Sequence, residues 1–303
     1  MTDAVEKPMV SIGMPVYNGE RFVRKAIKSI LSQTYPHFEL VISDNASTDA
    51  TSEICREYAS KDARVHYVRQ ERNIGATENF RFVLNAARHE RFVWAAADDW
   101  WDVDRLEKLV LALTPADSVV MGTVKRYLDN QPYAEYTPIS FDKGEWWKFL
   151  MREEARCDKV YFIYGLLWKS VAQEIIARDI VKGYAGDAIF NYGLLWRGNL
   201  KSIQGATLNV LAHLESTGTS EARGYRWSLS RLLYRAHPWD YYARYYKLTP
   251  SEHRLKLALA LVIKAFVSQS HLWWRAFRRV VLKKPYVHGA LPGAEYKVYH
   301  AGL

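Results

Sequence analysis

The amino-acid sequence predicts an α/β fold, in which helices flank a mostly parallel sheet, followed by a helical, basic C-terminal region. Two observations lead to this prediction. The first hundred residues alternate between short apolar runs and stretches with the 3.6-residue spacing of helices. Residues 221–303 hold 15 Lys and Arg against 4 Asp and Glu, whereas the rest of the chain holds 27 against 29. The sequence therefore divides into a near-neutral region, 1–220, and a basic region, 221–303.

The composition of the 303-residue chain, with 49% hydrophobic residues and a net charge of +9, excludes disordered, collagen-like and disulfide-scaffold proteins. Two cysteines, Cys55 and Cys157, are too few for a disulfide framework, which favours a reducing compartment. The first ten residues contain no apolar signal core. The longest apolar run near the end, Leu257–Ile263, is much shorter than the about 20 residues of a membrane span. We therefore expect a cytoplasmic protein without a membrane span.

Each element follows from its local pattern. Apolar runs predict four strands, at 10–14, 38–43, 64–69 and 91–95. Helical spacing predicts the helices that follow them, at 21–33, 49–60, 76–88 and 104–113. The later part predicts edge strands and loops over 121–144, a strand at 160–164, a helix over 170–178, a helix beginning at Asp187, one or two strands within 200–213, and helices from 221 onward.

Polar clusters follow three of the predicted strands, at Pro15–Asn18, Asp44–Asp49 and Asp98–Asp99. In open α/β sheets the ligand site lies outside the carboxyl ends of the strands. We therefore expect the three clusters to converge at one edge of the sheet and to form a binding site there.

The carboxylates at this edge allow both functional and structural interpretations. Asp98 and Asp99 would repel each other unless a cation compensates them, and such oxygen ligands suit Mg²⁺ or Mn²⁺ completed by substrate phosphates. The alternative is that Asp99 or Asp102 caps the next helix. Asp44 could accept from a base N–H or a ribose hydroxyl, or it could form an Asx-turn into the residues after it.

Four segments, in register, resemble the nucleotide-binding half of the family 2 glycosyltransferases, which have the GT-A fold. They are PVYN at Pro15–Asn18, SILSQTYPHFELVISDNASTD at Ser29–Asp49, RNIGATENF at Arg72–Phe80 and AAADDWWDVDRLEK at Ala95–Lys108. The resemblance implies inverting transfer from a nucleotide-diphosphate sugar, most simply a UDP-sugar, to a hydroxyl of a glycan or lipid-linked acceptor in surface polysaccharide synthesis. It implies a GT-A domain over 1–220, with a nucleotide-binding half, 1–115, and an acceptor half, 116–220.

The resemblance also implies roles for single residues. The nucleotide would be bound by Pro15, Tyr17, Asn18, Asp44, Asn73 and Asp98. The metal, Mg²⁺ or Mn²⁺, would be held by Asp98, Asp99 and His213. The chain departs from the family pattern at Ala96, where many members carry a leading acid, and Asp99 is the acid that could compensate.

Asp187 matches the family's general base, which takes a proton from the acceptor hydroxyl as it attacks the anomeric carbon. Its structural alternative is a helix cap stabilised by the macrodipole. His213 has the alternative of a structural histidine after an apolar strand. Trp100 and Trp101 could stack on the acceptor sugar, or they could be ordinary core residues.

The basic region contains a polar stripe with helical spacing, formed by Lys264, Ser268, His271, Arg275 and Arg278/Arg279. Leu, Val, Phe and Trp flank it, which is typical of a helix in an anionic membrane interface. We therefore expect residues 250–284 to hold the protein peripherally on the inner face of the cell membrane. The alternatives are a helical cap on the catalytic domain and a homo-oligomer surface. No nucleic-acid partner is expected, because no known reading module is present.

Two other functions compete with the transferase interpretation. A sugar-phosphate nucleotidyltransferase would need a glycine-rich, lysine-bearing loop after the first strand, but residues 15–20 contain only Gly19 and no lysine. A non-catalytic, degenerate binding protein is favoured by Ala96. The retention of Asp98, Asp99, Asp187 and His213 argues against it.

Overall fold

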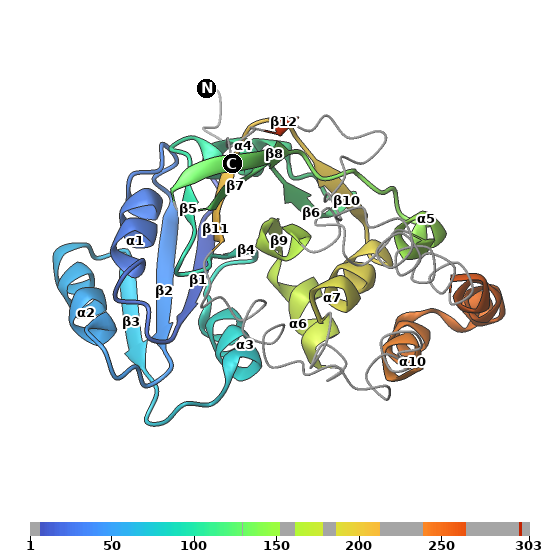
Figure 1. Ribbon diagram of the computed structural model, residues 1–303, viewed down its shortest axis with the longest axis horizontal. Helices are drawn as coiled ribbons and strands as arrows, with labels where there is room; N and C mark the ends of the chain where they lie inside the picture. Colours follow the sequence, from blue (N-terminus) through green and yellow to red (C-terminus); the bar gives the residue numbers. More distant parts are fainter. Residues whose placement is uncertain are drawn as a thin grey trace, which may run out of the picture.

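The computed structural model describes residues 7–128, 130–151, 161–177, 186–212, 239–264 and 297–298, and two sheets organise them (Figure 1). The larger sheet contains β1 (Val10–Val16), β2 (Phe38–Asp44), β3 (Val65–Arg69), β4 (Arg91–Trp94), β6 (Asp117–Met121), β9 (Leu166–Trp168) and β10 (Asn199–Ser202). Its strand order is β10-β6-β9-β4-β1-β2-β3. The smaller sheet contains β5 (Trp100–Trp101), β7 (Val124–Leu128), β8 (Gln131–Tyr136), β11 (Leu208–Ala212) and β12 (Lys297–Val298), in the order β12-β8-β7-β11-β5.

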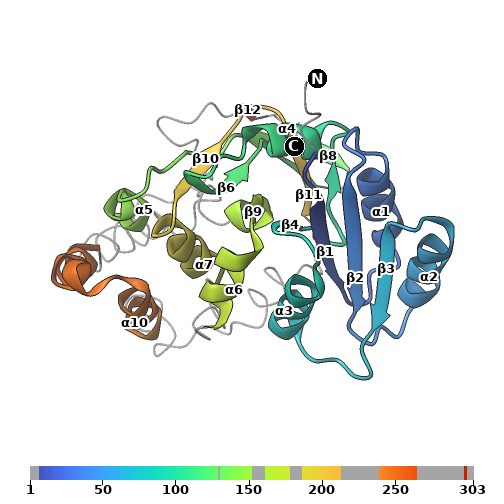
Figure 2. The same cartoon turned by 180° about the vertical axis from the view of Figure 1, so that it is seen from behind.

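Helices cover both faces of the larger sheet. The helices are α1 (Val23–Leu31), α2 (Thr51–Lys61), α3 (Ala76–Ala86), α4 (Arg105–Ala112), α5 (Trp146–Met151), α6 (Lys169–Ala177), α7 (Gly186–Leu195) and α10 (Trp239–Leu248). Helices α5 and α10 pack on α7. Two 3₁₀ helices, η2 (Tyr161–Tyr164) and η3 (Ser251–His253), and helical residues 254–264 complete the set. Helices α1 and α2 lie on one side of strands β1 to β3, and α3 lies on the other (Figures 1 and 2).

The strand directions confirm the predicted, mostly parallel sheet. Strands β4, β1, β2 and β3 run parallel to one another, and β10 runs parallel to β6. Strand β9 is antiparallel to both of its neighbours, β4 and β6. All residues of β1 and β2 are buried, as expected for central strands covered by helices on both faces.

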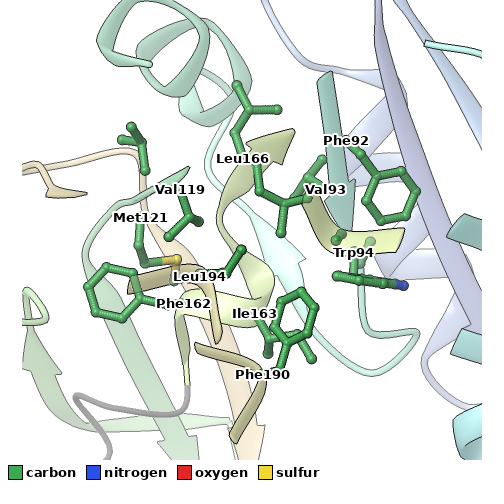
Figure 3. Close-up of a cluster of buried hydrophobic side chains, with 14 of the residues drawn as sticks. Phe92, Val93, Trp94, Val119, Met121, Phe162, Ile163, Leu166, Phe190 and Leu194 are labelled. Carbon is green, nitrogen blue, oxygen red and sulfur yellow. The ribbon is translucent and has the colours of Figure 1, made fainter. Parts of the chain in front are cut away.

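A hydrophobic core joins the sheet to the second half of the chain (Figure 3). The Trp94 ring at the end of β4 meets Phe92 and Phe190 edge to face, with ring centroids 4.8 and 5.5 Å apart. Phe190 belongs to α7, in which nine of ten residues are buried. Burial of this apolar helix against β4 and η2 fixes where its first turn lies, and that turn carries Asp187.

The strand predicted at 160–164 is wrong over the described residues 161–164, which form η2 instead. Its apolar, aromatic sequence is typical of a strand, but Phe162 and Ile163 are buried within a single 3₁₀ turn. The strand β9 begins two residues after this turn. At Gly165, between them, a Cβ atom would lie 2.6 Å from the Val120 carbonyl oxygen, so glycine permits this close approach.

Residues 239–248 and 251–264 of the basic region are helical, as predicted, but residues 297–298 form β12, which pairs with β8, so the prediction of helix is wrong there. One residue of the expected basic stripe also points inward. Lys264 is buried, and its Nζ donates to the carbonyl of Leu150 in α5. The prediction that Lys264 begins an outward basic face is therefore wrong. Ser268, His271, Arg275, Arg278 and Arg279 lie outside the described residues. None of the described helices is long and apolar enough to cross a membrane.

Candidate active site

The loops after β1 and β2 are joined at the carboxyl edge of the sheet by hydrogen bonds. The backbone N–H of Asn18 donates to Ser47 Oγ (2.9 Å), and the N–H of Thr48 donates back to Asn18 Oδ1 (2.9 Å). The N–H of Gly19 donates to Thr51 Oγ1 (2.7 Å). Asn18 has a positive φ of 49°, a conformation that asparagine tolerates better than most residues. Two of the three predicted clusters therefore form one connected surface.

Asp44 is fully buried at the end of β2, and its carboxylate accepts three hydrogen bonds. The donors are Ser47 N–H to Oδ1 (2.9 Å), Tyr67 O–H to Oδ2 (2.9 Å) and Arg69 Nη1 to Oδ2 (3.1 Å). Burial and then the bond to Asp44 raise the pKa of Tyr67 to about 12. The bond from Ser47 is the turn that the structural alternative predicted. Tyr67 and Arg69 hold the carboxylate in one orientation.

The other nucleotide-binding candidates lie around this carboxylate. Pro15 is buried in β1, whereas Tyr17 is 50% exposed. Asn73, in the loop after β3, is exposed, and its Oδ1 accepts from Asn45 Nδ2 (3.0 Å). Because Asn45 directly follows Asp44, this bond ties a third loop to the same edge.

The acidic pair lies beyond the end of β4, with Asp98 half-buried and Asp99 buried. Asp99 Oδ1 accepts a hydrogen bond from the N–H of Leu211 in β11 (3.0 Å). Burial and then the charge of Asp98 raise the pKa of Asp99 well above its usual range, against smaller opposing effects of Leu211, Arg105 and Arg126. Asp99 does not cap α4, since Asp104 precedes that helix and makes no side-chain cap. The capping alternative for Asp99 is therefore wrong.

Strand β11 connects the acidic pair to the acceptor half. It pairs antiparallel with β5, placing Leu208 opposite Trp101 and Asn209 opposite Trp100. Asn209 Nδ2 also donates to Asp102 Oδ1 (2.8 Å). The strand ends at Ala212, one residue before His213, which lies outside the described residues.

The residues present fit a divalent cation. No cluster of three or more His, Cys, Asp or Glu side chains that could hold a metal occurs within the described ranges, so Asp98 and Asp99 would be two ligands of a site completed by other groups. Two carboxylates, one of them buried beside the other's charge, are destabilised without a cation. Mg²⁺ takes one or two carboxylates and completes its shell with water and substrate phosphates.

Asp187 lies in the first turn of α7, where its side chain reaches solvent. The surrounding protein nevertheless desolvates it enough to raise its pKa. Macrodipole stabilisation of a capping carboxylate would lower the pKa, so desolvation is the larger effect here. This is the direction expected for a proton acceptor that works near neutral pH.

The buried phenol of Tyr164 lies within electrostatic reach of both Asp187 and the acidic pair. Burial, and then the charges of Asp187, Asp99 and Asp98, raise the pKa of Tyr164 well above its usual value. The η2 turn that carries it packs against both α7 and β4. Burial and the charges of Asp187 and the acidic pair therefore all favour the protonated Tyr164 hydroxyl.

The buried guanidinium of Arg105, at the start of α4, joins both halves beneath this site. It donates to the carbonyls of Ala206 and Tyr164, the latter at 2.8 Å. The guanidinium carbon, Cζ, lies 5.4 Å from the ring centroid of Trp101. Desolvation lowers the pKa of Arg105 to about 9, so it stays protonated at neutral pH. Its isolated sequence position gave no indication of this role.

We expect Arg105→Met to lower the free energy of unfolding by about 3 kcal/mol, because two carbonyls lose a charged donor inside the fold. Urea unfolding would measure the change. Lys108→Met, an exposed position of the same helix, is the matched control and should change stability little. Equal stability of both variants would contradict the structural role of Arg105.

The acceptor candidates Trp100 and Trp101 are packed into the fold. Trp101 is 5% exposed and belongs to the hydrophobic core. The Trp100 ring lies between Lys25, whose Nζ is 2.9 Å from its centroid, and Tyr127, whose ring centroid is 4.7 Å away. The core alternative therefore describes Trp101, and Trp100 is held by its neighbours.

A model of the family described as Glycosyl transferase family 2 matches residues 11–165, just over half of the chain. Among curated relatives, TuaG of Bacillus subtilis (strain 168), named as a teichuronic acid biosynthesis glycosyltransferase, is 37% identical over 102 residues. EpsH of the same organism, named as a glycosyltransferase, is 35% identical over 107 residues. These matches cover 34% and 35% of this chain but only 40% and 30% of the two relatives.

Solved structures share the fold at low sequence identity. S. aureus TarS (residues 1–349) with UDP-GlcNAc has a TM-score of 0.57 at 16% identity, covering 86% of this chain and 73% of TarS. The mannosyltransferase PcManGT of Pyrobaculum calidifontis, with GDP-Man and Mn²⁺, has a TM-score of 0.52 at 18% identity, covering 95% and 78%. The fold is therefore that of GT-A proteins. With the family model matching residues 11–165, the chain belongs to glycosyl transferase family 2.

Proposed function

We propose that the chain is an inverting, metal-dependent glycosyltransferase that moves a sugar from a nucleotide-diphosphate sugar to an acceptor hydroxyl. The observation that carries this proposal is the acidic pair Asp98–Asp99 beyond the end of β4, the neighbour of β1 in the sheet, with Asp99 buried and joined to β11 by the N–H of Leu211. The transferase domain is assigned to residues 1–220, with 1–115 as the nucleotide half and 116–220 as the acceptor half. Residues 221–303 form the basic region.

The donor lies across the carboxyl edge of β1 to β3 in this proposal. Exposed Tyr17 offers a ring face to the base, and Asn18 and Asn73 offer amide groups. Asp44 accepts from the base or ribose, held in place by Tyr67 and Arg69. The nucleotide sugars bound by TarS and PcManGT support this donor class. A UDP-sugar is the simplest choice.

Mg²⁺ or Mn²⁺ is proposed to bind at Asp98 and Asp99, with His213 as a further ligand. The cation would supply charge neutralisation for the departing diphosphate. The bond from Leu211 to Asp99 supports the participation of His213, because it brings β11 to the pair two residues before that histidine. The Mn²⁺ bound by PcManGT supports the choice of metal.

Asp187 is proposed as the general base. Its carboxylate takes the proton of the acceptor hydroxyl while the acceptor oxygen forms a bond to the anomeric carbon. The bond from that carbon to the diphosphate oxygen breaks in the same step, and its electron pair leaves with the nucleotide. A single displacement inverts the configuration at the anomeric carbon.

The acceptor is proposed to be a glycan or a lipid-linked sugar in surface polysaccharide synthesis, which the name of TuaG supports. A cytoplasmic protein held peripherally at the inner face of the membrane would meet such an acceptor. The 15 Lys and Arg against 4 acids in residues 221–303 support attraction to anionic lipid. The alternative is that the basic region forms the contact between two copies of the chain.

Two alternatives receive less support. A nucleotidyltransferase would need a phosphate-binding lysine after β1, and the chain has none between Pro15 and Glu20. A non-catalytic protein would have no reason to keep Asp187 desolvated at the start of α7.

The proposal predicts metal-dependent hydrolysis of one nucleotide sugar in the absence of acceptor. A panel of UDP-, GDP- and dTDP-sugars with Mn²⁺ or Mg²⁺ should reveal one donor that is hydrolysed and that raises the melting temperature. Chelation with EDTA should abolish hydrolysis. Stabilisation by a donor without hydrolysis or transfer under any metal condition would favour the non-catalytic alternative.

A further inference from the structure

The helix over residues 254–264 presents an apolar stripe to solvent. Leu255 is 83% exposed, Leu259 64% and Val262 66%, and these positions recur with the spacing of one helix face. Ile263, 47% exposed, lies beside them. The buried face also carries leucine, at 257 and 261. Within the described part of the chain the helix is therefore apolar on an exposed face, which is typical of an interaction surface.

This stripe lies at one end of the molecule. The segment packs on α5, where the His253 ring is 6.5 Å from Trp146 and Lys264 donates to the Leu150 carbonyl. Two further aromatic side chains in the adjoining helices are exposed, Trp147 in α5 (52%) and Tyr246 in α10 (44%). Helix α10 and this segment lie at the end opposite α2 (Figures 1 and 2).

Cations occur on the same segment as the stripe and on α10. Lys247 in α10 and Lys256 beside Leu255 are exposed, and Arg244 and Arg254 are half-buried. Between residues 242 and 264 the sequence contains one carboxylate, Glu252. An apolar helix face bordered by Lys, Arg, Tyr and Trp matches the chemistry of an anionic membrane surface.

We propose that the face formed by Leu255, Leu259, Val262 and Ile263, called here the apolar face, inserts into the boundary of an anionic lipid bilayer. Lys247 and Lys256 then meet the lipid headgroups. A second copy of the chain fits less well, because a two-fold contact would bring the same cations of both copies together. The inference extends the proposed function by naming the contact that would bring a lipid-linked acceptor to the enzyme.

The test is co-sedimentation of the full chain with vesicles of phosphatidylcholine and phosphatidylglycerol in equal parts. We expect the double variant Leu255→Ser/Leu259→Ser to weaken partitioning at least about tenfold, because two inserted side chains lose apolar contact. Leu111→Ser is the matched control: Leu111 in α4 is 79% exposed but lies outside the apolar face, and its replacement should leave partitioning unchanged.

Lys247→Glu/Lys256→Glu tests the charge contribution. It should weaken partitioning to the anionic vesicles, with a smaller effect at high salt. Unchanged partitioning of both double variants would overturn the proposal. So would conversion of a dimer to a monomer by Leu255→Ser/Leu259→Ser, which would assign the face to a second copy. Donor hydrolysis without vesicles should persist in all variants, so failure of the membrane contact is distinguishable from failure of the proposed reaction.

Discussion

Replacing Asp187 by Asn is expected to lower kcat for sugar transfer by about 10²- to 10⁴-fold, because the acceptor hydroxyl loses its proton acceptor. The amide keeps the shape of the side chain but cannot take the proton. Donor binding should be unchanged, since Asp187 belongs to α7 and not to the loops that are proposed to hold the nucleotide. Steady-state kinetics with the donor found in the panel would measure kcat, and titration would measure the donor Kd.

The pH profile gives a second signature of Asp187. Because desolvation raises its pKa, the carboxylate becomes protonated at a higher pH than an ordinary aspartate does. The acid limb of kcat/KM for the wild type should therefore lie above the usual range of Asp, and activity should fall as pH decreases through it. The residual activity of Asp187→Asn should lack this limb.

Measuring the stability of the Asp187→Asn variant shows whether its loss of activity comes from unfolding. A raised pKa in the folded state means that the ionised carboxylate disfavours folding at neutral pH. The variant should therefore unfold at the same or a higher urea concentration than the wild type. Asp142→Asn, an exposed carboxylate of the acceptor half, is the control and should retain activity. Unchanged transfer by Asp187→Asn would refute its assignment as the base.

The first half of the fold could be predicted because its signals are local. The buried spacing of Val23, Ala26, Ile27 and Ile30 in α1 is a pattern within one helix. The sequence pattern does not predict the short strand β6, and it predicts a strand at 160–164 where the structure has β9 at Leu166–Trp168. Three residues at β9 carry too little periodicity, and its position between β4 and β6 depends on contacts distant in sequence.

The site divides in the same way. Asp44, Asp98 and Asp187 could be proposed as site residues from motif positions, because a carboxylate at a strand end or helix start is visible in sequence. Tyr67 and Arg105 could not, since their importance comes from hydrogen bonds across 23 and 101 residues. The inward direction of Lys264 also depends on α5, whose Leu150 carbonyl accepts a hydrogen bond from its Nζ. Helical spacing identifies a face but not the side on which the rest of the chain packs.

Asp98→Asn is expected to abolish the stimulation of donor hydrolysis by Mn²⁺ or Mg²⁺ and to lower kcat by about 10²-fold or more. The physical reason is that an amide oxygen binds a divalent cation more weakly than a carboxylate does, and the departing diphosphate then keeps its charge. Asp99→Asn should weaken metal binding as well. Its amide oxygen can still accept from the N–H of Leu211, so the contact between the acidic pair and β11 should persist.

Donor hydrolysis would be titrated with metal in Asp98→Asn, Asp99→Asn and Asp104→Asn. The comparison separates loss of a metal ligand from a structural effect of removing a carboxylate. Asp104 lies six residues beyond Asp98 and pairs with Lys108 (2.6 Å), so its replacement alters a nearby carboxylate without touching the acidic pair. That control should keep the metal response of the wild type. In Asp99→Asn, relief of the repulsion from Asp98 should also raise the unfolding free energy in metal-free buffer. A cation site predicts that Asp99→Asn is more stable than the wild type without metal and less active with metal. A purely structural pair of acids does not predict both effects together.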